Sequence, residues 1–139
     1  MSSTDAISTG IDLVHIPAFV EQLKIPGSKF LDNFTAFELQ DVNVSGSIID
    51  VRYYESLAGK WAAKEAFIKA WSTLEIGIRP ALAQNDVNYC EIEVKKDTFG
   101  RPFIHLSGQL SIHFAQKAKI ALSISHDGDY ATAVVIMTP

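Results

Sequence analysis

The chain has 139 residues, 47% of them hydrophobic, and its 12 basic and 16 acidic residues give it a net charge of −4. This size suits one domain with a substantial core, and we expect a single domain over residues 1–139. A net negative charge is not typical of general nucleic-acid binders, and the sequence contains neither a membrane-length apolar run nor a signal-peptide pattern. Because its one cysteine, Cys90, also fits a reducing compartment, we expect a cytoplasmic protein.

Hydrophobic periodicity, together with Pro, Gly and capping residues, predicts short helices and strands around one long helix. Pro17 suits the start of the first helix, and Thr35 with Glu38 has the spacing of a capping box. The expected helices are Ala18–Lys24, Thr35–Val42, Tyr53–Trp71 and Gln109–Lys117, and the expected strands are Ile7–Val14, Tyr89–Lys96, Pro102–Leu106, Lys119–His126 and Tyr130–Met137.

Two stretches lack a clear period and are expected to be loops, Val44–Asp50 and Ser72–Val87. A loop as long as the second is often functional in a compact domain. Cys90 alternates onto the apolar side of its strand, so we expect it in the core. The fold class is α+β, with one antiparallel sheet wrapped around a long central helix.

The central helix contains the sequence LAGKWAAKEAFIKA over Leu57–Ala70, whose alanines would let another element approach closely. It is apolar or small on nearly all sides, which is typical of a buried helix. It nevertheless carries four charged side chains, and buried charges are costly unless they are paired or bound to a ligand. The charged residues are Lys60, Lys64, Glu65 and Lys69.

Asp12 is unusual because aspartate is depleted in strands, and it shares a face with Gly10 and Val14. It could be an edge residue facing water, a cap for the next helix, or a ligand for a cation. Glu65 likewise could pair with Lys69 one turn away. Two carboxylates on separate elements suit Mg²⁺, and lysines around them suit a polyphosphate, so the residues favour a metal–phosphate site.

Four patterns in order resemble the holo-[acyl-carrier-protein] synthase family of 4′-phosphopantetheinyl transferases, and the actinobacterial members in particular. They span nearly the whole chain, and their order makes the resemblance specific. They are Gly10-Ile11-Asp12, Trp61–Ala70 (WAAKEAFIKA), Gly100-Arg101-Pro102 and Ser123–Ala131 (SISHDGDYA).

The resemblance implies an enzyme that moves 4′-phosphopantetheine from coenzyme A to a serine of apo acyl carrier protein in fatty acid biosynthesis, releasing adenosine 3′,5′-bisphosphate. It implies that Asp12 and Glu65 bind Mg²⁺ and that Lys69 faces the phosphates. The base that deprotonates the serine would be Glu65, Asp12 or a metal-bound water. The residues implied to contact coenzyme A are Lys60, Lys64, Lys69, Arg101, Ser125 and His126.

Several of these residues also have ordinary explanations. Lys64 could be a surface lysine with a buried stem, His126 a strand-end histidine beside its turn, and Arg101 part of the hairpin chemistry. Lys60 replaces the usual arginine, which keeps the charge but loses the bidentate fork. The arginine implied to grip the carrier is Ala18 here, so recognition would be less electrostatic or the carrier different, such as a carrier domain of a fatty acid synthase.

The family is implied to form homotrimers with active sites between subunits. The strand Tyr130–Met137 fits this, because it is apolar or small on both faces and a short chain has few elements to cover both. Two other functions are weighed: an α+β acyl-CoA thioesterase, which would need no Mg²⁺, and a non-catalytic module that binds coenzyme A or the carrier. Both fit Lys64, Glu65 and Lys69 on one buried helix less well.

Overall fold

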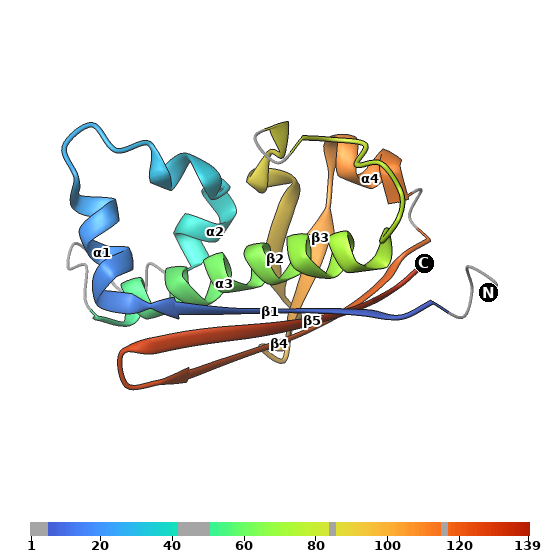
Figure 1. Cartoon of the computed structure of the whole chain (residues 1–139). Helices are drawn as coiled ribbons and strands as arrows, with labels where there is room; N and C mark the ends of the chain where they lie inside the picture. Colours follow the sequence, from blue (N-terminus) through green and yellow to red (C-terminus); the bar gives the residue numbers. More distant parts are fainter. Residues whose placement is uncertain (1–5, 42–50, 84–85, 115–116) are drawn as a thin grey trace.

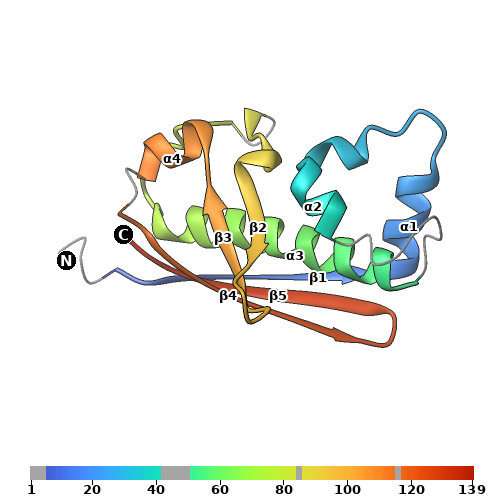
Figure 2. The same cartoon turned by 180° about the vertical axis from the view of Figure 1, so that it is seen from behind.

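The computed structural model describes residues 6–41, 51–83, 86–114 and 117–139. Its central element is helix α3, Val51–Leu74, which extends the predicted helix at both ends. Figure 1 shows α3 lying along a sheet formed by β1 (Ser8–His15), β4 (Lys119–Asp127) and β5 (Tyr130–Thr138). The hairpin of β2 (Ile92–Lys96) and β3 (Pro102–Leu106) covers the other side of the helix, as Figure 2 shows from behind.

The α+β class and the long central helix are confirmed, but the strands form two sheets where the sequence predicted one. The larger sheet is antiparallel with the order β1-β5-β4, and β2 pairs only with β3. Strand β3 lies against β4 without joining its ladder. Alternation along a strand is the same in either arrangement, so it could not distinguish one sheet from two.

The smaller elements cover the two ends of α3. Helix α1 (Ile16–Lys24), the 3₁₀ turn η2 (Phe30–Asn33) and α2 (Ala36–Asp41) lie at one end, and α4 (Gly108–Phe114) lies at the other. Pro17 stands in the first turn of α1 as predicted. The capping box is also confirmed, because the Thr35 amide donates to Glu38 and the Glu38 amide donates to the Thr35 hydroxyl.

Two predictions change around the first hairpin. The strand begins at Ile92, because Tyr89–Glu91 form the 3₁₀ turn η4, capped by the Asn88 side chain. This turn removes Cys90 from the core, and its thiol donates to the carbonyl of Asp32. The loop predicted over Val44–Asp50 lies outside the described residues, and so does the last residue of the predicted helix Thr35–Val42.

The core is built around the alanine side of α3. Five alanines of the helix are fully buried, and they face the inner side chains of β1 and β5: Ala58, Ala62, Ala63, Ala66 and Ala70. None of the helices in the described ranges is long and apolar enough to cross a membrane.

Strand β1 approaches α3 at Gly10. A Cβ atom at this position would overlap the carbonyl oxygen of Ala66 and lie 2.6 Å from the amide nitrogen of Ala70. Both obstacles are backbone atoms, so no side-chain rotation could make room. The glycine and the small alanines together let the strand touch the helix backbone.

The outer face of the three-stranded sheet is apolar and exposed. Ile11 and Leu13 of β1 are 61% and 64% exposed, and Ile136 and Tyr130 of β5 extend the same face. The inner residues of β5 alternate with them and are buried. The described part of the chain therefore covers β5 on one face only.

Replacing Gly10 by alanine should lower the free energy of unfolding by at least about 2 kcal/mol, because β1 must move away from α3. Guanidinium denaturation at fixed protein concentration measures this. Thr9→Ala, on the outer face of the same strand, is the control and should stay within about 0.5 kcal/mol of the parent. Ala70→Gly should not rescue Gly10→Ala, since the clash is with backbone; rescue would contradict this account.

Candidate active site

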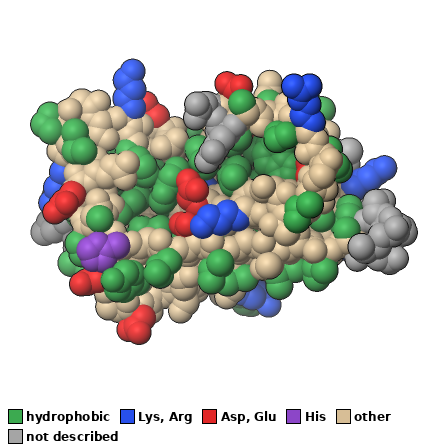
Figure 3. Space-filling view, in the orientation of Figure 1, with side chains coloured by type: hydrophobic (Ala, Val, Ile, Leu, Met, Phe, Trp, Pro, Cys, Tyr) green, Lys and Arg blue, Asp and Glu red, His purple; other side chains and the backbone are tan. Residues whose placement is uncertain are grey.

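Asp12 and Glu65 lie where β1 crosses α3. Asp12 is two residues beyond Gly10 and points toward the helix on the same face of the strand. The Lys69 ammonium lies 3.1 Å from an Asp12 carboxylate oxygen and 3.0 Å from the Ile11 carbonyl oxygen. Figure 3 shows acidic and basic side chains meeting in the middle of this face, between α3 and β1. The two predicted carboxylates are thus neighbours, and the Lys69 side chain stays 54% exposed.

The two carboxylates influence each other. Burial, and then the charge of Asp12, raise the pKa of Glu65 above its usual value. A hydrogen bond from Tyr89 and the charge of Lys69 act in the opposite direction. Two carboxylates face one ammonium here, so the group has a net negative charge when all three side chains are ionised. Such a pair attracts a cation.

A group of aromatic side chains lies next to Glu65 on α3. The Tyr89 ring packs on Trp61 with 4.8 Å between centroids, and Phe30 packs on the same indole at 4.7 Å. Burial, then the charge of Glu65 and the interaction of its carboxylate with the Tyr89 hydroxyl, raise the pKa of Tyr89 to about 12. Tyr89 is therefore a neutral hydrogen-bond donor at physiological pH.

Lys64 is a structural residue and not an exposed ligand contact. Its side chain and that of Glu38 are fully buried, and the ammonium lies 2.8 Å from the Glu38 carboxylate. It also donates to the carbonyls of Tyr89 and Ile92 at 2.8 and 2.7 Å, so all three of its N–H groups are used. Burial lowers the pKa of Lys64, and the charge of Glu38 opposes that shift. Within the subunit these contacts leave the Lys64 ammonium no free N–H group for the predicted coenzyme A contact.

Lys60 is also buried, at 3% exposure, and its ammonium donates to the Ser56 hydroxyl. It lies five residues before Glu65, which places the two side chains about 140° apart around the helix. The structure therefore does not bring Lys60 to the carboxylate pair. Its predicted role as a phosphate contact lacks support from this arrangement.

His126 lies on the opposite edge of the sheet from Asp12. Its Nε2 is 2.8 Å from the Glu55 carbonyl, and a Cβ at Gly59 would lie 2.9 Å from that nitrogen. Strand β5 separates β4 from β1, so the two edges are about 10 Å apart. Ser125 is the neighbouring residue of the strand and faces the outer side of the sheet.

Arg101 follows the turn of the β2–β3 hairpin and is exposed. Its guanidinium donates to Asp97 and lies over the Phe99 ring, 5.1 Å from the ring centre. The predicted site residues thus occupy three regions of one subunit: the carboxylate pair with Lys69, the β4 edge, and the hairpin tip. A single subunit joins only the first of these into a site.

The carboxylate pair fits a Mg²⁺ ion that keeps waters and substrate oxygens. No group of three or more His, Cys, Asp or Glu side chains within the described ranges could enclose a metal by itself. Mg²⁺ is commonly held by one or two carboxylates, with water and phosphate oxygens completing its octahedron. The two carboxylates match that donor set, and the exposed lysine beside them suits the substrate phosphate.

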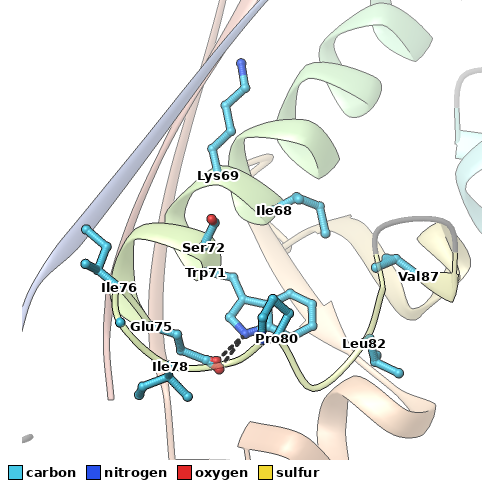
Figure 4. Close-up of a pocket in the computed structure, with 11 residues that line it drawn as sticks. Ile68, Lys69, Trp71, Ser72, Glu75, Ile76, Ile78, Pro80, Leu82 and Val87 are labelled. Carbon is cyan, nitrogen blue, oxygen red and sulfur yellow. Dashed lines mark hydrogen bonds between the residues drawn. The ribbon is translucent and has the colours of Figure 1, made fainter.

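A cavity of about 620 Å³ lies beyond Lys69, between the end of α3 and the segment that follows it. Figure 4 shows that its walls are mostly apolar and that the Lys69 side chain points away from them. Lys69 is the one predicted site residue that lines it. The cavity thus adjoins the site without containing the carboxylates.

The sequence patterns did not indicate that Tyr89 lies at the site or that Glu38 pairs with Lys64. Glu38 has a clear signal as a capping residue, but its spacing does not reveal Lys64, 26 positions later, as a partner. Tyr89 is a plain aromatic residue in the sequence, and only the turn η4 directs it toward α3.

The chain is similar to known proteins over almost its whole length. The sequence model of the 4′-phosphopantetheinyl transferase superfamily matches residues 8–135. A holo-[acyl-carrier-protein] synthase of Corynebacterium glutamicum is 48% identical, covering 95% of this chain and 98% of the relative. The ACPS–CoA complex of Chronobacterium ammoniagenes has a TM-score of 0.86 at 44% identity, covering 96% of this chain and 98% of the other. The Mycobacterium tuberculosis acyl carrier protein synthase has a TM-score of 0.74 at 38% identity, covering 96% and 100%.

Lys64→Met should lower the free energy of unfolding by about 3–5 kcal/mol, because it leaves the Glu38 carboxylate buried without its cation. Chemical denaturation at fixed concentration measures the change. Lys29→Met, which removes an exposed lysine, is the control and should stay within about 0.5 kcal/mol of the parent. A ligand contact would give the reverse pattern, with normal stability and weaker coenzyme A binding.

Proposed function

Because the chain belongs to the 4′-phosphopantetheinyl transferase superfamily, we propose that it is a holo-[acyl-carrier-protein] synthase. It transfers 4′-phosphopantetheine from coenzyme A to a serine of apo acyl carrier protein and releases adenosine 3′,5′-bisphosphate. The observation that carries this proposal is the meeting of Asp12, Glu65 and Lys69 on one exposed face. The family match removes the support for the thioesterase and for the non-catalytic module.

Asp12 and Glu65 would hold Mg²⁺ in this proposal. The ion, when bound, supplies a positive charge that neutralises the pyrophosphate and stabilises the leaving group. The protein contributes two carboxylates fixed on separate rigid elements, one on β1 and one on α3. A cation held by both would offset their mutual repulsion and the cost of their partial burial.

Lys69 would bind the phosphates. Its ammonium is already held at the site by Asp12 and the Ile11 carbonyl, and its exposed side allows phosphate oxygens to approach from solvent. Because the lysine side chain is flexible, its ammonium can follow a phosphate that changes position during transfer. The chemistry is a displacement at phosphorus: the serine oxygen forms a bond to phosphorus while the bond to the nucleotide oxygen breaks.

The coenzyme A site would be completed by a second subunit. Arg101, Ser125 and His126 lie outside the region of the carboxylate pair but are exposed, so a neighbouring copy could present them to the bound nucleotide. The exposed apolar face of the sheet supports association with further copies of this chain. We take the assembly to be a homotrimer with sites between subunits.

The physiological partner would be an acyl carrier protein, or a carrier domain of a fatty acid synthase, in the cytoplasm. Ala18 of α1 has no charge to offer an acidic carrier, and the exposed Glu21 on the same helix is acidic. Carrier recognition at this helix would therefore rest less on ion pairs. Residues 1–139 would act as one domain.

Asp12→Asn and Glu65→Gln should each lower transfer at least 100-fold, roughly the effect of losing several kcal/mol of charge stabilisation at the phosphate. Mass spectrometry of an apo acyl carrier protein incubated with coenzyme A and Mg²⁺ measures the product. Asp32→Asn removes an exposed carboxylate away from the site and should keep full activity. Near-normal turnover of either site variant at low Mg²⁺ would show that its ligand role is wrong. No product from the parent protein with any apo carrier would refute the transferase itself.

Ile136→Glu places a charge on the apolar outer face of the sheet and should dissociate the assembly, with a matching loss of transfer. Light scattering coupled to size-exclusion chromatography measures the oligomer. Ile112→Glu, the same substitution at an exposed position of helix α4, should leave both assembly and activity unchanged. A fully active monomer of Ile136→Glu would contradict the proposal that sites lie between subunits.

A further inference from the structure

Tyr89 contacts α3 with three separate parts of the residue. Its ring packs on Trp61, its carbonyl accepts a hydrogen bond from Lys64, and its hydroxyl interacts with the neighbouring Glu65 carboxylate. These helix positions are related as i, i+3 and i+4, so they lie on one side of α3. Tyr89 therefore lies along the helix, with its hydroxyl directed at the carboxylate that the proposed function assigns to the cation.

The backbone of Tyr89 is fixed independently of its ring. The Asn88 side chain accepts from the Cys90 amide, and the Asn88 carbonyl accepts from the Glu91 amide, which closes the turn η4. Lys64 holds the Tyr89 carbonyl at 2.8 Å, and Glu38 in turn holds Lys64. A fully buried ion pair thus anchors the residue whose hydroxyl reaches the site.

We propose that Tyr89 is a positioning residue for Glu65, and that its hydroxyl holds the carboxylate in the orientation that binds a divalent cation. The phenol donates to one carboxylate oxygen and leaves the remaining lone pairs for the ion. A glutamate side chain has several rotatable bonds, so a fixed donor reduces the freedom that binding would otherwise remove. The inference rests on the proposed function, because it concerns the same cation site.

The ring of Tyr89 also packs on Trp61, so a purely structural role is the alternative. The two differ in a testable way. A structural role requires the ring, whereas the positioning role requires the hydroxyl. Tyr89→Phe separates them, because it keeps the ring on Trp61 and the carbonyl on Lys64 and removes one oxygen.

The probe is Mn²⁺ alone, added to the full chain without coenzyme A, with free Mn²⁺ counted by electron paramagnetic resonance. Tyr89→Phe should bind Mn²⁺ about tenfold more weakly, the effect usual for losing an outer partner of a metal ligand. Tyr54→Phe is the matched control, since its ring packs on Tyr53 and under Lys24, and its Mn²⁺ affinity should equal that of the parent. The melting temperature of Tyr89→Phe should fall by no more than about 5 °C, as for loss of one hydrogen bond.

A second measurement serves if Tyr89→Phe melts lower than this. The transfer rate is then followed against Mg²⁺: a positioning defect disappears at saturating Mg²⁺, whereas a packing defect persists at every concentration. Equal Mn²⁺ affinity of Tyr89→Phe and the parent would overturn the inference while leaving the proposed function intact, and Asp12→Asn, measured beside them, shows that the ion bound is the one at this site. A parent protein that binds no Mn²⁺ and transfers no phosphopantetheine would overturn both.

Discussion

The backbone contact between β1 and α3 at Gly10 is the constraint on which the rest of the molecule depends. A strand that carries side chains normally lies farther from a helix, because the Cβ atoms of both elements must fit between them. Here the strand has no Cβ at the crossing, and the helix presents Ala66 and Ala70. The short distance leaves Asp12, two residues further along the strand, beside the helix turn that carries Glu65 and Lys69. A longer side chain at residue 10 would separate the carboxylates before it disturbed any ligand.

The charged side chains of α3 fall into two groups, one satisfied inside the subunit and one open to solvent. Lys64 is fully removed from water, and a carboxylate with two carbonyls satisfies it inside the subunit. Glu65 and Lys69 keep access to solvent, and partial burial, followed by the charge of Asp12, raises the pKa of Glu65. Buried charges with a full set of partners help to fix the arrangement of a structure. Charges that lack such partners favour the binding of a ligand of opposite charge. The same helix therefore serves both purposes on different faces.

The sequence predicts the local features well and the long-range pairings poorly. The capping box of Thr35 and Glu38 was predictable because both residues lie in one turn. The two-residue period of a strand placed Asp12 on one face with Gly10 and Val14, but it did not show that this face is the inner one, because the apolar Ile11 and Leu13 lie on the other. The Lys64 partner was not predictable, because Glu38 lies on another helix and the capping motif accounts for its side chain already. The position of Tyr89 depends on a short 3₁₀ turn, which has no strong residue signature.

Under the proposed function, the exposed sheet face and the divided site residues have one physical explanation. The helices and the β2–β3 hairpin of this 139-residue chain cover α3, so nothing in the described ranges covers the outer face of β1 and β5. That face carries Ile11 and Leu13 on either side of Asp12 in the sequence, so an apolar contact there would fix the strand that holds the carboxylate. In the proposed assembly, the same contact would also bring the exposed β4 edge and hairpin tip of another copy within reach of that strand. One association step would then both bury the apolar face and complete the site. A subunit that failed to associate would have neither.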